Sequence, residues 1–331
     1  MNNLNEIARL LIAPGKGILA ADESTGTIGK RFAKIAVENN EENRRVYREM
    51  LFTASNLGKY ISGVIMYDET IRQRASDGHT FVTILEDQGI LPGIKVDEGT
   101  EIMTDSPTEA TTKGLENLSS RLPGYVNMGA KFCKWRAMFK ISDNTPTENC
   151  LKINAERLAE YARLCQENNL VPIVEPEVLM EGEHSIQKCY EVTKKVLTAV
   201  FAELKSQGVD LSGIVLKPNM IISGLERAER DDAAEVATQT IQCLKETVPS
   251  EVPGIAFLSG GQSEEQACAN LNEINKIARD CPWQLTFSYG RALQASALRA
   301  WGGKNENITA AREAFLNQAR LTALARNGEL N

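Results

Sequence analysis

One lysine stands where a buried strand is expected to end. The segment 213–219 reads GIVLKPN, in which an apolar, β-branched run leads into Lys217, and Pro218 cannot continue a central strand. Burial favours the uncharged form of an amine, so a lysine in this place is a candidate nucleophile towards a carbonyl. The alternative is a side chain that leaves the sheet and points into water, as most lysines do. The ends of the other strands bear on that choice.

Charged or polar residues also end most of the other short apolar runs. Asp68 is typical of a turn and is given no role. Buried charges are rare unless they are paired, so several of them at strand ends suggest one shared site. The residues in these positions are Asp22, Lys95, Lys134, Arg136, Glu175, Glu177, Ser259, Ser288 and Arg291.

The cations among these residues predict the electrostatics of the site. Lys95, Lys134, Arg136 and Arg291 would surround Lys217 with positive charge. A like charge ~4 Å away costs about 4 kcal/mol at an effective dielectric constant of 20. We therefore expect Lys217 to be partly uncharged at physiological pH, as imine formation requires. The same cations would attract an anionic, phosphorylated substrate, and the carboxylates would exchange protons with it.

Two glycine-containing segments follow the last two expected strands. They read SGG at 259–261 and SYGR at 288–291, and glycine lets a backbone approach a ligand closely. SGG alone is usually just a turn, but the two segments together predict a phosphate site. His79 and His184 are too few and too far apart for a zinc site. We expect no catalytic metal and no cofactor.

The order of the expected elements predicts how these residues are brought together. Strands and helices alternate in the second half of the chain, which favours parallel strands joined by right-handed crossovers. Eight such units predict a single-domain (β/α)8 barrel over 1–331, with an extra N-terminal helix and a C-terminal helix. The alternative is an open doubly wound sheet, but no GxGxxG follows the first strand. Helices are expected at 4–12, 42–57, 147–168, 185–206, 233–248 and 308–326.

Composition limits the classes of function. The chain has 331 residues and a net charge of −7, which argues against general nucleic-acid or anionic-membrane binding. Its seven cysteines are scattered without a CxxC, as expected of free thiols in a reducing compartment. No apolar run approaches the ~20 residues of a membrane span, and the N-terminus lacks a signal-peptide pattern. We expect a cytoplasmic protein.

Seven motifs occur in a fixed order along the chain. They are GILAADEST at 17–25, GIKVD at 93–97, KWR at 134–136, PIVEPE at 172–177, VLKPNM at 215–220, FLSGGQS at 257–263 and SYGRALQ at 288–294. A set of motifs in fixed order is far more specific than any one of them. Through these motifs the sequence resembles class I fructose-bisphosphate aldolase, a metal-independent barrel enzyme, from about residue 4 to about residue 328.

The resemblance implies reversible cleavage of fructose 1,6-bisphosphate to dihydroxyacetone phosphate and glyceraldehyde 3-phosphate. Lys217 matches the Schiff-base lysine, and Glu175 the acid/base that expels water from the carbinolamine. Glu177 matches the neighbouring carboxylate. Asp22 matches the group that takes the proton of the C4 hydroxyl, and Lys134 a cation that positions and charge-balances the substrate.

The resemblance also implies which residues bind the substrate. Arg136 matches an ion-pairing arginine. The group near the other phosphate is Ser24, Arg31 and Lys95. The group at the C1 phosphate is Ser259, Gly260, Ser288, Gly290 and Arg291, with Gly261 in the same loop.

Some features depart from the family, and some alternatives stay open. Thr27 stands where many relatives carry serine, and the sequence given stops at Asn331 without the tyrosine-ended tail of the familiar animal enzymes. The resemblance implies a homotetramer. The alternatives are a Schiff-base enzyme for a related sugar phosphate, such as sedoheptulose bisphosphate, and a non-enzymatic scaffold, for example one that binds cytoskeletal filaments.

Overall fold

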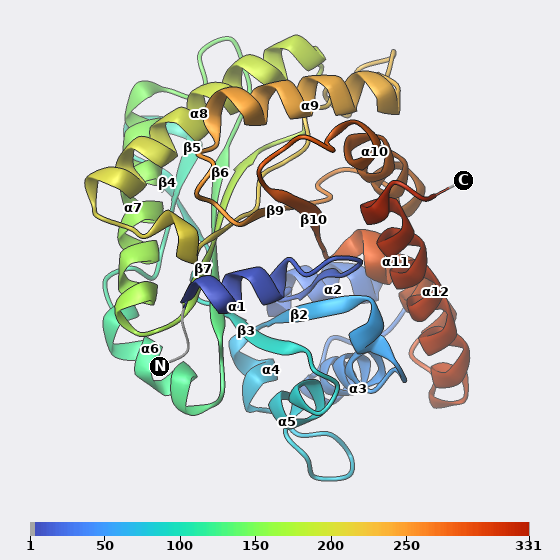
Figure 1. Cartoon of the computed structure of the whole chain (residues 1–331). Helices are drawn as coiled ribbons and strands as arrows, with labels where there is room; N and C mark the ends of the chain where they lie inside the picture. Colours follow the sequence, from blue (N-terminus) through green and yellow to red (C-terminus); the bar gives the residue numbers. More distant parts are fainter. Residues whose placement is uncertain (1–3, 331) are drawn as a thin grey trace.

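A closed barrel of eight parallel strands forms the centre of the molecule (Figure 1). The computed structural model describes residues 4–330, so Asn331 lies outside it. The expected fold class is confirmed, and the open doubly wound alternative is wrong. Around the barrel the strands are β1 (Gly17–Ala21), β10 (Gln284–Tyr289), β9 (Gly254–Phe257), β8 (Val215–Leu216), β7 (Val171–Val178), β6 (Phe132–Phe139), β3 (Leu91–Lys95) and β2 (Ile61–Met66).

Helices surround the barrel in Figure 1. Side-chain oxygens cap several of them. Thr147 accepts from the backbone N–H of Cys150 at the start of α7, and Ser263 and Gln266 form a capping box at the start of α10. The helices are α1 (Leu4–Leu11), α2 (Thr25–Ala33), α3 (Glu41–Phe52), α4 (Asp68–Arg72), α5 (Phe81–Glu86), α6 (Leu118–Asn127), α7 (Glu148–Glu167), α8 (Ile186–Ser206), α9 (Ala233–Thr247), α10 (Glu264–Ile277), α11 (Arg291–Trp301) and α12 (Ile308–Asn327).

The two faces of each strand serve different cores. Alternate residues pack inside the barrel, and the residues between them pack against the helices. On β6, Phe132 belongs to the inner cluster while Cys133 and Trp135 belong to the outer one. Two residues beyond Phe132, on the same face, comes Lys134. Ile173 and Val215 also belong to the inner cluster, and Glu175 and Lys217 follow two residues after them. Because side chains two residues apart lie on the same face of a strand, these charged groups point into the mouth of the barrel.

Helix α1 closes the opposite end of the barrel. Its apolar residues Ile7, Ala8 and Leu11 pack with the inner residues of the strands, and Ile12 follows in the same cluster. In Figure 1 the helix lies across the barrel. The amino ends of the strands are therefore plugged, which leaves the carboxyl ends as the open face for a ligand.

Several elements were not expected from the sequence. An antiparallel hairpin of β4 (Thr100–Met103) and β5 (Ser106–Thr112) follows β3. It was missed because few of its residues are buried, so it has no alternating apolar pattern. Helices α2, α4, α5, α6 and α11 are short and were also missed. Helix α3 ends at Phe52, before the expected end at residue 57, and β8 is only two residues long.

A glycine in β3 makes room for the largest side chain of the inner cluster. A Cβ atom on Gly93 would lie 2.2 Å from Cζ of Phe132, closer than atoms can approach. We therefore expect Gly93→Val to lower the free energy of unfolding by about 3 kcal/mol or more, because the inner core has no space to yield. Urea unfolding measures this. Gly26→Val is the control, because a Cβ there meets nothing within 4 Å; equal stability losses in the two variants would contradict the prediction.

Candidate active site

A cavity of about 1450 Å³ opens at the carboxyl ends of the strands. Every candidate site residue from the sequence lines it, although these residues come from segments between 22 and 291. Asp68, which was given no role, lies in the outer part of the same cavity beside Tyr125, whose hydroxyl donates to it at 2.8 Å. This convergence follows from the fold, because all eight strands end on the same face of the barrel.

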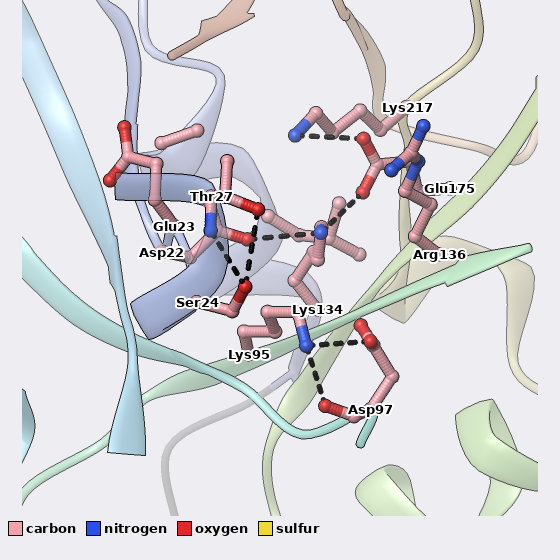
Figure 2. A network of polar contacts seen from close by, with 12 residues as sticks. Asp22, Glu23, Ser24, Thr27, Lys95, Asp97, Lys134, Arg136, Glu175 and Lys217 are labelled. Atoms are coloured by element: carbon pink, nitrogen blue, oxygen red, sulfur yellow. Dashed lines mark hydrogen bonds and ion pairs between the residues drawn. The ribbon is translucent and has the colours of Figure 1, made fainter. Parts of the chain in front are cut away.

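Lys134 lies at the centre of a buried ion-pair network (Figure 2). Its Nζ is 2.9 Å from Oδ2 of Asp22 and 2.8 Å from Oε2 of Glu175. The other oxygen of Glu175, Oε1, is 3.1 Å from Nζ of Lys217. Strands β1, β6, β7 and β8 thus bring two amines and two carboxylates into one alternating chain. Lys217 is 3% exposed, which excludes the alternative of a side chain in water.

The network shifts the pKa values of its members. Burial by itself would raise the pKa of Asp22, but the charges of Lys134 and Lys217 outweigh it and hold that pKa well below its usual range. The same balance of burial against Lys134, Lys217 and Arg136 lowers the pKa of Glu175. Burial would lower the pKa of Lys134, but Asp22 and Glu175 raise it. All three groups are therefore charged at neutral pH.

Glu177 has the opposite shift. It forms an ion pair with Nε of Arg136, yet burial raises its pKa more than that arginine lowers it, and the charge of Glu175 adds to the rise. Oε1 of Glu177 would lie 2.8 Å from a Cβ atom on Gly260, so the carboxyl group packs directly against this glycine. Glycine at 260 is required here because a side chain would displace Glu177.

The four cations expected around Lys217 all line the cavity, but three of them form ion pairs with carboxylates. Lys134 and Arg136 are paired as described above. Lys95 Nζ lies 2.6 Å from Oδ1 of Asp97, as Figure 2 shows. Asp97 was not expected as this partner, because it lies beyond the charged end of the strand. The site is therefore close to charge balance, and Glu175 is the group that faces the Lys217 amine.

Helix α2 begins at the cavity wall. Ser24 is its N-cap, and its Oγ accepts from the backbone N–H of Thr27 at 3.3 Å. The two hydroxyls are 3.1 Å apart, so threonine at 27 keeps the polar contact. Both residues line the cavity together with Lys95. Hydroxyls and a cation at a helix N-terminus form an environment suited to an anion.

The glycine-containing loops after β9 and β10 lie on another part of the cavity wall. Ser288 is 1% exposed, and its Oγ has no hydrogen-bond partner within the described residues. Gly261 has a φ of +73°, which other residues rarely adopt. Arg291 starts α11, is exposed, and donates to the backbone oxygen of Gln262 at 3.3 Å. An unpaired buried hydroxyl and an exposed guanidinium that line the same cavity suit an anion that supplies acceptors.

Arg31 is placed differently from the group with which the resemblance associated it. It pairs with Glu23, and its Nη2 would lie 3.5 Å from a Cβ atom on Gly290. It therefore lies beside the loop after β10, and which phosphate it contacts stays a prediction. Glu23 itself was missed by the sequence analysis, although it directly follows Asp22 and is buried.

Two further findings concern metals and membranes. Among residues 4–330, no group of three or more histidine, cysteine, aspartate or glutamate side chains could hold a metal ion. Within the same residues, every helix is too short or too polar to cross a membrane.

The comparisons with known proteins agree on one family. The model of the class I fructose-bisphosphate aldolases matches residues 3–331. The chain is 52% identical to the cytosolic fructose-bisphosphate aldolase 4 of Arabidopsis thaliana, over 95% of this chain and 80% of that one. It is 50% identical to fructose-bisphosphate aldolase B of Gallus gallus, over 98% and 90%. The solved aldolase of Plasmodium falciparum, in complex with TRAP and an inhibitor, superposes with a TM-score of 0.97 at 48% identity, over 99% and 95%.

Proposed function

Because this chain belongs to the class I fructose-bisphosphate aldolase family, we propose that Lys217 is the amine through which it acts. The chain reversibly cleaves fructose 1,6-bisphosphate to dihydroxyacetone phosphate and glyceraldehyde 3-phosphate, a step of glycolysis. One observation carries the role of Lys217. This lysine is buried at the cavity wall, and its Nζ lies 3.1 Å from Oε1 of Glu175. Among the described residues, Lys134 is the one other lysine whose Nζ forms an ion pair with Glu175, and Lys134 is also paired with Asp22.

Glu175 supports formation of the imine. In the resting site it is a carboxylate 3.1 Å from Nζ of Lys217, so it can take a proton from the ammonium group. The resulting amine attacks the C2 carbonyl of the open-chain sugar, and the carbonyl oxygen becomes the hydroxyl of a carbinolamine. The protonated Glu175 then returns its proton to this hydroxyl, which leaves as water. A protonated imine on Lys217 remains.

Asp22 supports cleavage of the carbon–carbon bond. Its low pKa keeps it ionised, so it can accept the proton of the C4 hydroxyl. As that proton leaves, the C4 oxygen forms a carbonyl, the C3–C4 bond breaks, and its electron pair moves into the imine to give an enamine. Lys134, 2.9 Å from Asp22, keeps a positive charge beside the reacting hydroxyl throughout.

We assign the two ends of the substrate to the two polar walls of the cavity. The C1 phosphate is bound by the loops after β9 and β10, where the Oγ of Ser288 lacks a partner. The other phosphate is bound at the start of α2, by Ser24 and Lys95. Lys217 and Glu175 then lie between the two, at the carbonyl. To bind this phosphate, the Lys95 ammonium group has either to leave Asp97 or to contact Asp97 and the phosphate at the same time.

A substrate comparison tests this assignment. We expect kcat/KM for fructose 1-phosphate to be about 100-fold or more below that for the bisphosphate, because two charge-assisted contacts are lost. EDTA should leave both rates unchanged. Equal rates for the two sugars would mean that Ser24 and Lys95 bind nothing. Loss of activity with EDTA would mean that the amine mechanism is wrong.

Other features of the protein remain proposals. We propose one domain over 1–331, a cytoplasmic location like that in the name of the Arabidopsis relative, and a homotetramer. The seven-carbon alternative is favoured by nothing in the family match or in the relatives described. A scaffold without catalysis would have no need for Lys217, Glu175 and Asp22 in mutual contact.

A further inference from the structure

One buried carboxylate beside the active site holds two guanidinium groups. Glu23 follows the end of β1, and one of its oxygens, Oε1, forms an ion pair with Nη1 of Arg31. Its other oxygen, Oε2, lies 2.6 Å from Nη2 of Arg48 on α3. Gln294 of α11 completes the set, since its Nε2 donates to Oε1 of Glu23 at 3.0 Å. None of these contacts takes part in the chemistry described above.

The charges in this cluster do not balance. Two arginines share one carboxylate, so one positive charge is left over in a largely dry environment. A guanidinium in such a place gains from an additional anion, because buried charges are stable when they are paired. The two arginines also repel one another, which lowers the cost of moving one of them away.

The two arginines differ in what they can reach. The side chain of Arg31 is 20% exposed, lines the cavity, and lies beside Gly290 of the expected phosphate loop. The side chain of Arg48 is 3% exposed and does not line the cavity. Arg31 is therefore the member that can turn to a ligand, and Arg48 is the member that stays.

Arg48 is buried among its neighbours, although its Nε and Nη1 have no hydrogen-bond partner within the described residues. Its guanidinium lies 5.8 Å from the centre of the Tyr47 ring. The hydroxyl of Tyr47 donates to Oε1 of Gln294 at 3.0 Å, and Nε2 of Gln294 also donates to the backbone oxygen of Ala20 in β1 at 2.9 Å. Glu23 thus keeps a cation and an amide partner when Arg31 leaves it.

We propose that Arg48 is a positioning residue that lets Arg31 exchange Glu23 for a phosphate group of the substrate. By keeping Glu23 paired, Arg48 removes the penalty that would otherwise tie Arg31 to this carboxylate. The inference rests on the proposed function, because it takes a sugar phosphate as the anion that Arg31 receives. Arg48 touches neither the substrate nor the reacting groups.

Steady-state kinetics with fructose 1,6-bisphosphate tests the inference. In Arg48→Met, Glu23 has Arg31 as its sole cation, so we expect KM to rise about tenfold while kcat changes less than about twofold. Arg31→Met should raise KM to a similar extent. The double variant Glu23→Gln/Arg48→Met frees Arg31 again, and its KM should return to the wild-type value or below it. Arg48→Lys keeps the charge and should also keep the wild-type KM.

The controls separate this role from a purely structural one. Arg312→Met removes a different arginine that binds the backbone of α3, at Met50, away from the cavity, and should leave KM unchanged. Equal KM increases in Arg48→Met and in the double variant would overturn the inference. If Arg48→Met does not fold, the double variant decides, because it replaces both charges by neutral groups. In that case, a KM of the double variant as high as that of Arg31→Met would overturn the inference.

The outcome also distinguishes this inference from the proposed function. An unchanged KM in Arg31→Met would overturn the inference while wild-type cleavage of the bisphosphate stood. A wild-type protein that does not cleave the bisphosphate would overturn the proposed function itself.

Discussion

Lys217→Met is expected to reduce kcat by at least about four orders of magnitude, because the variant cannot form a covalent imine. Methionine is close to lysine in length and is apolar, so it fits a site that is 3% exposed without leaving a cavity. Glu175 keeps its second partner, Lys134, 2.8 Å away. The fold should therefore survive, and a coupled assay for glyceraldehyde 3-phosphate measures the loss of rate.

The matched control is a lysine of the same barrel at its opposite end. Lys131 directly precedes β6, pairs with Glu86 at 3.3 Å, and does not line the cavity. Lys131→Met should keep full activity. A Lys217→Met variant that is folded by circular dichroism and retains more than about one-tenth of the wild-type kcat would contradict the assignment, because no other nucleophile is proposed.

The second large effect is expected for Lys134→Met. This change removes the closest cation of Asp22 and one of the two ion-pair partners of Glu175, which keeps its contact with Lys217. Burial then dominates and the pKa values of both carboxyl groups rise. We expect kcat to fall by about 10²–10⁴-fold, the usual range for losing general acid–base function. The acidic limb of the pH–rate profile should move to higher pH, which a profile of kcat/KM between pH 5 and pH 9 measures.

The same variant should be less stable in a way that depends on pH. In the wild type the pKa values of Asp22 and Glu175 lie below their ordinary values. Their ionisation therefore contributes stability above the unfolded-state pKa of about 4, and this contribution is lost only as pH falls through the lower folded-state values. Lys134→Met should cost about 3–5 kcal/mol at pH 7, because it breaks a buried ion pair. The deficit should persist down to about pH 4 and shrink as the pH falls below that value.

A surface pair provides the comparison for this effect. Lys194 and Glu246 are 2.7 Å apart but about half and one-third exposed. Lys194→Met should change the free energy of unfolding far less than Lys134→Met does, because surface ion pairs contribute little. A Lys134→Met variant that is as stable as Lys194→Met at pH 7, with an unchanged pH–rate profile, would contradict the role given to Lys134.

Much of the fold and site could be predicted from where charges interrupt apolar strands. In the sequence Lys134 and Arg136 alternate with Cys133, Trp135 and Ala137, and the structure shows the same alternation of inner and outer faces. Because parallel strands in a barrel all end on one face, residues as distant as Asp22 and Arg291 could be expected in one cavity.

What the sequence did not yield are the partners across strands and loops. Asp97 lies two residues from Lys95, but it falls outside the apolar pattern of the strand, which therefore does not indicate that the two are paired. Glu23 directly follows a predicted site residue, but its pairing with Arg48 depends on how α3 packs against β1. Long-range pairs of this kind leave no periodic signal along the chain.

The central claim is that the Lys217 amine forms a covalent bond to the sugar carbonyl carbon. Its most direct test is to treat the protein with dihydroxyacetone phosphate and sodium borohydride, and then to locate the added mass by peptide mass spectrometry. The account predicts one reduced adduct, on the peptide that contains Lys217, and none in Lys217→Met. An adduct on Lys134 or Lys95 instead, or no adduct in an active protein, would contradict it.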